Sequence, residues 1–203
     1  RWMRGQRRRA HNRPMTPSRE LQADALLADH RQGEGVGRLT VFLGAAPGVG
    51  KTYAMLSRAR DLARQGQDVV IGIVETHGRS ETAALLDGLP MIARKHVDHQ
   101  GRRLDEFDVD AMLARRPGIA LIDELAHRNV PGSRHERRWQ DVMELLDAGI
   151  DVYTTVNIQH LESLNDIVHR ITGVRVSETV PDGVFDRLRD IRLVDLPPRE
   201  LIE

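Results

Sequence analysis

A glycine-rich turn between an apolar run and a helical stretch constrains the fold of this chain most. The apolar run covers residues 39–43, Gly44 follows it, and a helical pattern comes after the turn. The turn consists of Ala45, Ala46, Pro47, Gly48, Val49, Gly50, Lys51 and Thr52. Its glycines allow successive backbone N–H groups to point inward, and the following helix adds the positive end of its dipole. The turn predicts a phosphate-binding loop, in which Lys51 reaches the outer phosphates and the Thr52 hydroxyl completes a Mg²⁺ shell.

The first position of this loop departs from the usual pattern G-x-x-x-x-G-K-[ST]. Ala45 occupies the place of the first glycine, and a glycine stands one residue earlier, at Gly44. Because alanine is small enough for this position, the prediction of a phosphate-binding loop stands.

Short apolar runs alternate with longer helical stretches along most of the chain. Strands are predicted at residues 39–43, 69–74, 119–123, 151–156 and 191–195. Helices are predicted at residues 51–65, 104–115, 134–148 and 161–172. This alternation is typical of parallel strands joined by crossover helices. Together with the loop, it predicts the α/β class and a P-loop NTPase-like three-layer sandwich with a mainly parallel central sheet.

Two acids end the predicted strand at residues 119–123. Burying Asp123 and Glu124 there would be costly unless they faced a cleft with a cation or a proton to manage. Next to a phosphate-binding loop, Asp123 is predicted to hold Mg²⁺, usually through a water, and Glu124 to orient or deprotonate the attacking nucleophile. The alternative is a helix cap or an ordinary surface pair.

Polar side chains also follow two other predicted strands. Asn157 and Gln159 come after the strand at 151–156, and Glu75 comes after the strand at 69–74. Ligands of open parallel sheets bind at the carboxyl ends of the strands. Asn157 or Gln159 is expected to sense the terminal phosphate, unless Asn157 only caps a helix. Glu75 and Glu124 are alternative candidates for a catalytic base.

The segment that follows the acid pair, residues 125–135, is rich in arginine and histidine. One interpretation is that Arg128, Arg134 or His127 contacts phosphate; the other is an ordinary solvated loop. If a ligand regulates this chain, we expect this segment to move.

Composition divides the 203 residues into two parts and excludes several classes of function. Residues 1–36 are predicted to be a basic arm with a short helix at 20–29, and residues 37–203 a phosphate-binding domain. The net charge of zero favours neither nucleic acid nor membrane, and no nucleic-acid partner is expected. The chain has no cysteine, which excludes disulfides and thiol chemistry. No apolar run approaches the length of a membrane span.

Five segments resemble the KdpD family of potassium sensor kinases, over about residues 37 to 198. They read GRLTVFLGAAPGVGKTYAML, VETHGR, DELAH, PGSRH and TTVNIQHLESLND. The order of the strands also resembles the P-loop class in which a glutamate follows the Mg²⁺-binding aspartate. That second resemblance places the strand before Asn157 between the strand that ends at Asp123 and the strand that precedes the loop.

The family resemblance implies an ATP-binding domain in the cytoplasmic part of an inner-membrane sensor histidine kinase that controls a potassium transporter. It implies further domains, a cognate response regulator and a homodimer in the full-length protein. We expect a regulatory ATP- and Mg²⁺-binding domain; the alternative is true catalysis, either ATP hydrolysis or phosphoryl transfer to a protein hydroxyl. A small-molecule kinase is a third interpretation, for which the sequence offers no acceptor pocket.

Overall fold

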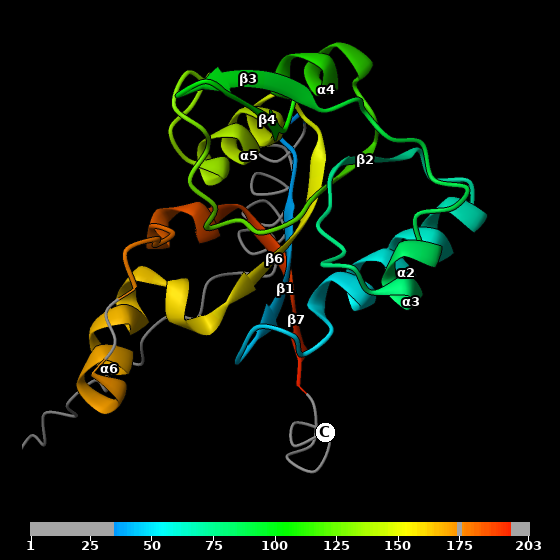
Figure 1. Ribbon diagram of the computed structural model, residues 1–203. Helices are drawn as coiled ribbons and strands as arrows, with labels where there is room; N and C mark the ends of the chain where they lie inside the picture. Colours follow the sequence, from blue (N-terminus) through cyan, green and yellow to red (C-terminus); the bar gives the residue numbers. More distant parts are fainter. Residues whose placement is uncertain (1–34, 174–175, 196–203) are drawn as a thin grey trace, which may run out of the picture. The chain divides into compact units, whose positions relative to one another are not determined.

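The computed structural model describes residues 35–173 and 176–195, and a parallel five-stranded sheet forms their centre (Figure 1). The strands are β1 (Leu39–Gly44), β2 (Val69–Ile73), β5 (Ile119–Ile122), β6 (Asp151–Asn157) and β7 (Leu188–Val194). Their spatial order is β2-β5-β6-β1-β7. β6 therefore lies between the strand that leads to the acid pair and the strand that leads into the glycine-rich loop, as the resemblance to the P-loop class implies. The α/β class and the parallel sheet are confirmed.

Helices cover both faces of this sheet and complete the three layers. They are α2 (Lys51–Arg64), α3 (Ser80–Ala84), α4 (Val109–Arg115), α5 (Arg138–Asp147) and α6 (Glu162–Thr172), with 3₁₀ turns η1 (Ile158–His160) and η2 (Asp182–Arg187). Side chains alternate between the faces along β1: Phe42 packs with α2, whereas Leu39 and Val41 belong to the core that contains α5. The two faces of one strand thus enter two separate cores.

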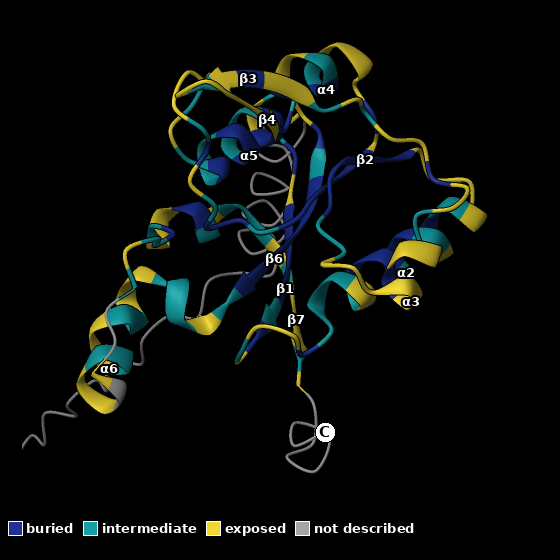
Figure 2. Ribbon diagram, viewed as in Figure 1, coloured by how far each residue is buried: buried dark blue, intermediate teal, exposed yellow. Residues whose placement is uncertain are grey.

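Most of the parallel sheet is buried (Figure 2). All residues of β2 and β5 are buried, and so are the five residues between the end positions of β6. Strands covered on both faces read as continuous apolar runs, which is why the sequence predicts them well. Within the described part of the chain, no helix is both long enough and apolar enough to span a bilayer.

The helix predicted at residues 104–115 is wrong in its first half. Residues 95–106 form an antiparallel hairpin of β3 (Lys95–His99) and β4 (Arg102–Glu106), and the helix begins only at Val109. Gln100 and Gly101 both have positive φ, 49° and 74°, which matches the right-handed twist of a two-residue hairpin. Asp108 then starts α4, because its carboxylate accepts a hydrogen bond from the Ala111 N–H at 3.0 Å.

Two further elements begin three or four residues away from the predicted start. α5 begins at Arg138 rather than at residue 134, because the residues before it form a bridge between Arg128 and Arg137. β7 begins three residues earlier than predicted, at Leu188, and pairs in parallel with β1. The part of the predicted basic arm up to residue 34, with its short helix, lies outside the described residues.

Candidate functional site

The glycine-rich loop connects β1 to α2 in a conformation that depends on its glycines. Gly48 and Gly50 have φ of 88° and 92°, in the left-handed region that side chains disfavour. Val49 between them is buried and anchors the loop to the domain. Gly50 is the residue that precedes α2, and as a glycine it has no side chain to cap the helix N–H groups. These groups are therefore available to bind an anion at the positive end of the helix dipole.

Gly44 explains the altered first position of the loop. A Cβ atom at Gly44 would lie 2.5 Å from Val49 Cγ2 and 2.9 Å from Lys51 Cδ. The close approach of backbone to side chains thus occurs at this residue. Ala45, in the usual glycine position, is exposed, so its methyl group meets no such obstacle.

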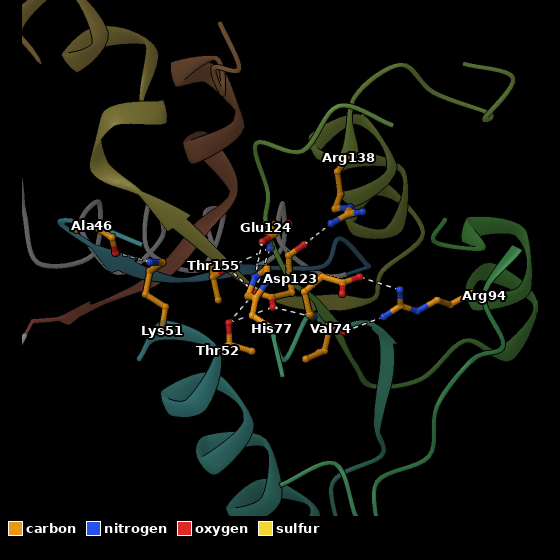
Figure 3. Close-up of polar contacts among 11 residues, drawn as sticks. Ala46, Lys51, Thr52, Val74, His77, Arg94, Asp123, Glu124, Arg138 and Thr155 are labelled. Carbon is orange, nitrogen blue, oxygen red and sulfur yellow. Dashed lines mark hydrogen bonds and ion pairs between the residues drawn. The ribbon is translucent and has the colours of Figure 1, made fainter. Parts of the chain in front are cut away.

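Lys51 lies across the loop, and its Nζ donates a hydrogen bond to the Ala46 carbonyl at 2.9 Å (Figure 3). Partial burial lowers the pKa of Lys51, while the nearby carboxylates of Asp123 and Glu124 oppose this effect. The two acids favour the charged form of Lys51, and partial desolvation strengthens the electrostatic attraction between this ammonium group and an anion.

Asp123 is fully buried and receives several hydrogen bonds (Figure 3). The Thr155 hydroxyl donates to Oδ1 at 2.5 Å, and the Thr52 hydroxyl donates to Oδ2 at 3.1 Å. The backbone N–H groups of Glu75 and Glu124 donate at 3.2 and 3.1 Å. Burial raises the pKa of Asp123, and the hydrogen bonds from Thr155 and the Glu75 N–H oppose that rise. A cation at this position would stabilise the ionised carboxylate, as the hydrogen bonds do.

Glu124 has a left-handed backbone, with φ of 56°, at the point where the chain leaves the sheet. Its Oε1 lies 3.1 Å from Nε2 of His77, which is itself left-handed. Non-glycine residues in this region cost conformational energy and cluster at functional sites. The conformation places the carboxylate beside the loop, whereas Asp123 points into the interior.

Glu75, the other candidate base, has a different environment. Arg94 donates to its carboxylate at 2.8 Å and to the Val74 carbonyl at 2.9 Å (Figure 3). The carboxylate of Glu75 is thus held by an arginine, whereas that of Glu124 contacts a histidine.

A cavity of about 230 Å³ joins these residues. It is lined by the loop, the two glutamates and the end of β6, including Pro47, Gly48, Gly50, Lys51, Thr52, Glu75, Glu124 and Asn157. Among the described residues, the side chain of Asn157 makes no capping hydrogen bond to η1, and its buried Oδ1 has no hydrogen-bond partner. Gln159 does not line the cavity; His160 does. Of the two predicted sensors, the structure brings only Asn157 to the loop.

The segment at 125–135 is attached to the domain by several contacts. The Arg138 N–H donates to the His127 carbonyl at 3.0 Å, and Asn129 is buried. His127 lines the cavity and contacts Glu106 of β4 at 2.8 Å. Arg128 and Arg134 form ion pairs with Glu136 and with Glu144 and Asp110, and neither lines the cavity. Of the three residues that were predicted to contact phosphate, only His127 lines the cavity.

Sequence reasoning missed three residues of this site. Thr155 is a polar residue within a buried strand, a signal that the sequence contains. Arg138 is 1% exposed and donates to the Asp123 carbonyl at 2.9 Å, but nothing in its local sequence distinguishes it from a surface arginine. Arg79, the last residue of the segment VETHGR, lines the cavity, and its guanidinium lies 3.4 Å from the Gly48 carbonyl.

Thr52 and Asp123 suit Mg²⁺, which prefers oxygen ligands and usually keeps several waters while bridging to phosphate. One hydroxyl and one carboxylate, side by side next to the glycine-rich loop, match that requirement without a cluster of acids. Among residues 35–173 and 176–195, no group of three or more histidine or acidic side chains gathers as a metal site.

A family profile and several known proteins match this chain over most of its length. The KdpD family profile, described as the osmosensitive K+ channel His kinase sensor domain, matches residues 35–203. Sensor protein KdpD of Escherichia coli (strain K12) is 56% identical over 191 residues, which is 94% of this chain and 21% of that protein. Sensor protein KdpD of Mycobacterium tuberculosis (strain H37Rv) is 54% identical over 165 residues, 81% of this chain and 19% of that protein.

A shorter relative, the putative sensor protein KdpD of Synechocystis sp., is 53% identical over 174 residues, 86% of this chain and 46% of that protein. The chain therefore spans less than half the length of each of these three relatives.

Proposed function

The chain belongs to the KdpD family of sensor domains, and from that premise we propose that it binds ATP with Mg²⁺ as a regulatory domain of a sensor histidine kinase. The observation that supports this most is the contact between Thr52 and Asp123, whose oxygens lie 3.1 Å apart. It joins the phosphate-binding loop to the acid that ends β5, which is the arrangement that a Mg²⁺-nucleotide requires.

Each group of the site has a role in this proposal. The N–H groups of Gly48 and Gly50 and the first turn of α2 bind the phosphates. Lys51 exchanges the Ala46 carbonyl for a phosphate oxygen, and Thr52 and Asp123 hold Mg²⁺ directly or through water. When bound, Mg²⁺ neutralises part of the phosphate charge. Asn157 lines the cavity, and in this proposal its amide NH2 group donates a hydrogen bond to the terminal phosphate.

Regulation requires that the nucleotide bind one conformation better than another. His127 lies at the cavity and contacts Glu106, so a nucleotide that displaces His127 would alter the hairpin of β3 and β4. In the longer protein, we propose that such a change reaches further domains of a homodimeric, membrane-anchored kinase. This kinase would act on a response regulator and so control the expression of a potassium transporter, with this domain in the cytoplasm.

Catalysis is the second candidate function, and the environment of Glu124 favours it. The Glu124 carboxylate lines the cavity, and within the described residues its ion-pair partner is His77, whereas that of Glu75 is an arginine. Glu124 would accept a proton from water, which gives ATP hydrolysis, or from a protein hydroxyl, which gives phosphoryl transfer.

One set of variants separates these functions. Wild type, Glu124→Gln and the control Glu75→Gln are tested for MgATP binding and phosphate release, and each is also placed in the full-length kinase for an autophosphorylation assay. A regulatory domain binds MgATP, releases negligible phosphate and keeps its effect on autophosphorylation in Glu124→Gln. Phosphate release that Glu124→Gln abolishes and Glu75→Gln retains would instead establish catalysis. Absence of MgATP binding by the wild type would refute both functions.

A further inference from the structure

A second cavity, of about 590 Å³, lies next to the phosphate-binding loop. It shares four lining residues with the first cavity: Gly50, Tyr53, Arg79 and Thr82. The two cavities therefore meet around the first turn of α2. The remaining lining residues come from the loop, from α2, from α3 and the residues before it, and from the end of β7 with the residue that follows it. They are Val49, Ala54, Gly78, Ser80, Glu81, Val194 and Asp195.

The two cavities lie on different sides of the loop with respect to the acid pair. Glu75, Glu124 and Asn157 line the first cavity, and none of them lines the second. Mg²⁺ and the catalytic base act at the terminal phosphate of a nucleotide. The terminal phosphate therefore belongs beside Asp123 and Glu124. The opposite end of the nucleotide must then leave the loop past the first turn of α2, which is where the second cavity begins.

The charge of the second cavity suits a nucleoside and not a phosphate. Glu81 and Asp195 are its acids, and its arginine, Arg79, stands at the boundary with the first cavity. Carboxylates repel phosphate but accept hydrogen bonds from ribose hydroxyls and from the amino group of a base.

Tyr53 offers a surface on which a base can stack. It is the third residue of α2 and is 46% exposed, although the α2 residues Met55 and Leu56 are fully buried. An exposed aromatic side chain at the junction of two cavities provides a flat apolar face, and base–aromatic stacking tolerates any base. Val194 adds an apolar contact from the end of β7.

We propose that this second cavity is the nucleoside subsite of the chain. The nucleobase packs against Tyr53 and Val194, and the ribose hydroxyls or the amino group of the nucleobase face Asp195 or Glu81. The inference rests on the proposed binding of MgATP at the loop. It assigns a ligand contact to the end of β7, an edge strand that otherwise has no role in the site.

The test compares two probes, MgATP and magnesium tripolyphosphate, by titration calorimetry with the full chain. The proteins are wild type, Tyr53→Ala, the conservative variant Tyr53→Phe and Lys51→Ala. Wild type is expected to bind MgATP more tightly than tripolyphosphate. Tyr53→Ala should weaken MgATP binding roughly 5- to 150-fold, the usual worth of one stacked base, and leave tripolyphosphate binding unchanged. Tyr53→Phe should retain wild-type affinity for both probes, and Lys51→Ala should lose both.

Retained tripolyphosphate binding also shows that Tyr53→Ala is folded. Equal MgATP affinity in wild type and Tyr53→Ala would overturn the subsite while leaving the phosphate-binding function intact. Equal affinity of wild type for the two probes would overturn it as well. If the wild type binds neither probe, the proposed function itself fails and the subsite fails with it.

Discussion

The Thr52 hydroxyl lies 3.1 Å from a carboxylate oxygen of Asp123, although 71 residues separate them in the sequence. The sheet order produces this contact, because β6 lies between β1 and β5 and places Thr155 beside the same carboxylate. A hydroxyl from the loop and a carboxylate from the second strand along thus converge on one point, where a divalent cation can bind both.

Replacing Thr155 tests the support of this carboxylate. Thr155→Val keeps the shape of the side chain but removes the donor to Asp123, whose pKa is already raised by burial. We expect Mg²⁺-dependent ATP affinity to fall about 10- to 100-fold, the usual effect of losing a partner behind a metal ligand. Thr155→Ser keeps the hydroxyl and should recover most of the affinity. Equal Mg²⁺ dependence in the valine and serine variants would exclude this role.

Gly44 and Ala45 give opposite predictions for the start of the loop. Gly44→Ala places a methyl group 2.5 Å from Val49 Cγ2, so we expect the free energy of unfolding to fall by about 1–3 kcal/mol and nucleotide affinity to fall with it. Ala45→Gly restores the usual motif at an exposed position and should change neither quantity appreciably. Urea unfolding and MgATP titration of both variants check this, and a tolerated Gly44→Ala would contradict it.

The helical and strand elements next to the loop could be predicted because their physical signals are local. Apolar runs mark strands that are buried on both faces, and glycines follow the ends of helices; Gly66, Gly149 and Gly173 all have positive φ. The β3–β4 hairpin was missed because its strands carry mostly charged side chains and face solvent. Its signal was the Gln100-Gly101 turn rather than an apolar pattern.

The candidate site was predictable only where a motif specifies it. The loop and the acid pair belong to motifs with characteristic residue patterns. Thr155 and Arg138 belong to no such motif and reach Asp123 only because the chain folds. The register of β6 against β5 pairs Thr154 with Ile122, so the next residue, Thr155, comes beside Asp123. The spacing of residues in one sequence does not reveal how two strands are aligned in a sheet. Gln159 shows the converse: its place after a strand suggested a sensor, yet it does not line the cavity.

Arg138 supports Asp123 from the interior, and its removal should be costly. It is 1% exposed, donates to the Asp123 carbonyl at 2.9 Å and lies 3.8 Å from the buried Glu106 carboxylate. Arg138→Met leaves Glu106 without this cation, so we expect the free energy of unfolding to fall by about 3–5 kcal/mol. Adding Glu106→Gln should recover part of the loss. Urea unfolding of the single and double variants measures this coupling; strictly additive losses would argue against it.

Asp141 makes the stability of the fold depend on pH. Burial raises its pKa to about 6, and the hydrogen bond that Asn129 donates at 2.7 Å opposes the rise. The folded state therefore keeps a proton that the unfolded chain releases, so the contribution of Asp141 is greatest below about pH 4 and is lost as pH rises to about 6. The loss is on the order of 3 kcal/mol.

Asp141→Asn should remove this loss, because the amide stays neutral at every pH. The variant should therefore be more stable than wild type at about pH 7, and the difference should shrink toward about pH 4. Urea unfolding at several pH values checks it. A stability difference that does not vary with pH would show that folding does not raise the pKa of Asp141.

The most direct test of the central claim is titration calorimetry of MgATP into wild type, Lys51→Ala and Lys95→Ala. The chain contains only these two lysines, and Lys95 is an exposed residue of β3 that lies 3.6 Å from Asp110. Our account predicts that wild type and Lys95→Ala bind MgATP with equal affinity and that Lys51→Ala does not bind it measurably. Absence of binding by wild type, or equal binding by Lys51→Ala, would contradict the assignment of this loop as a nucleotide site.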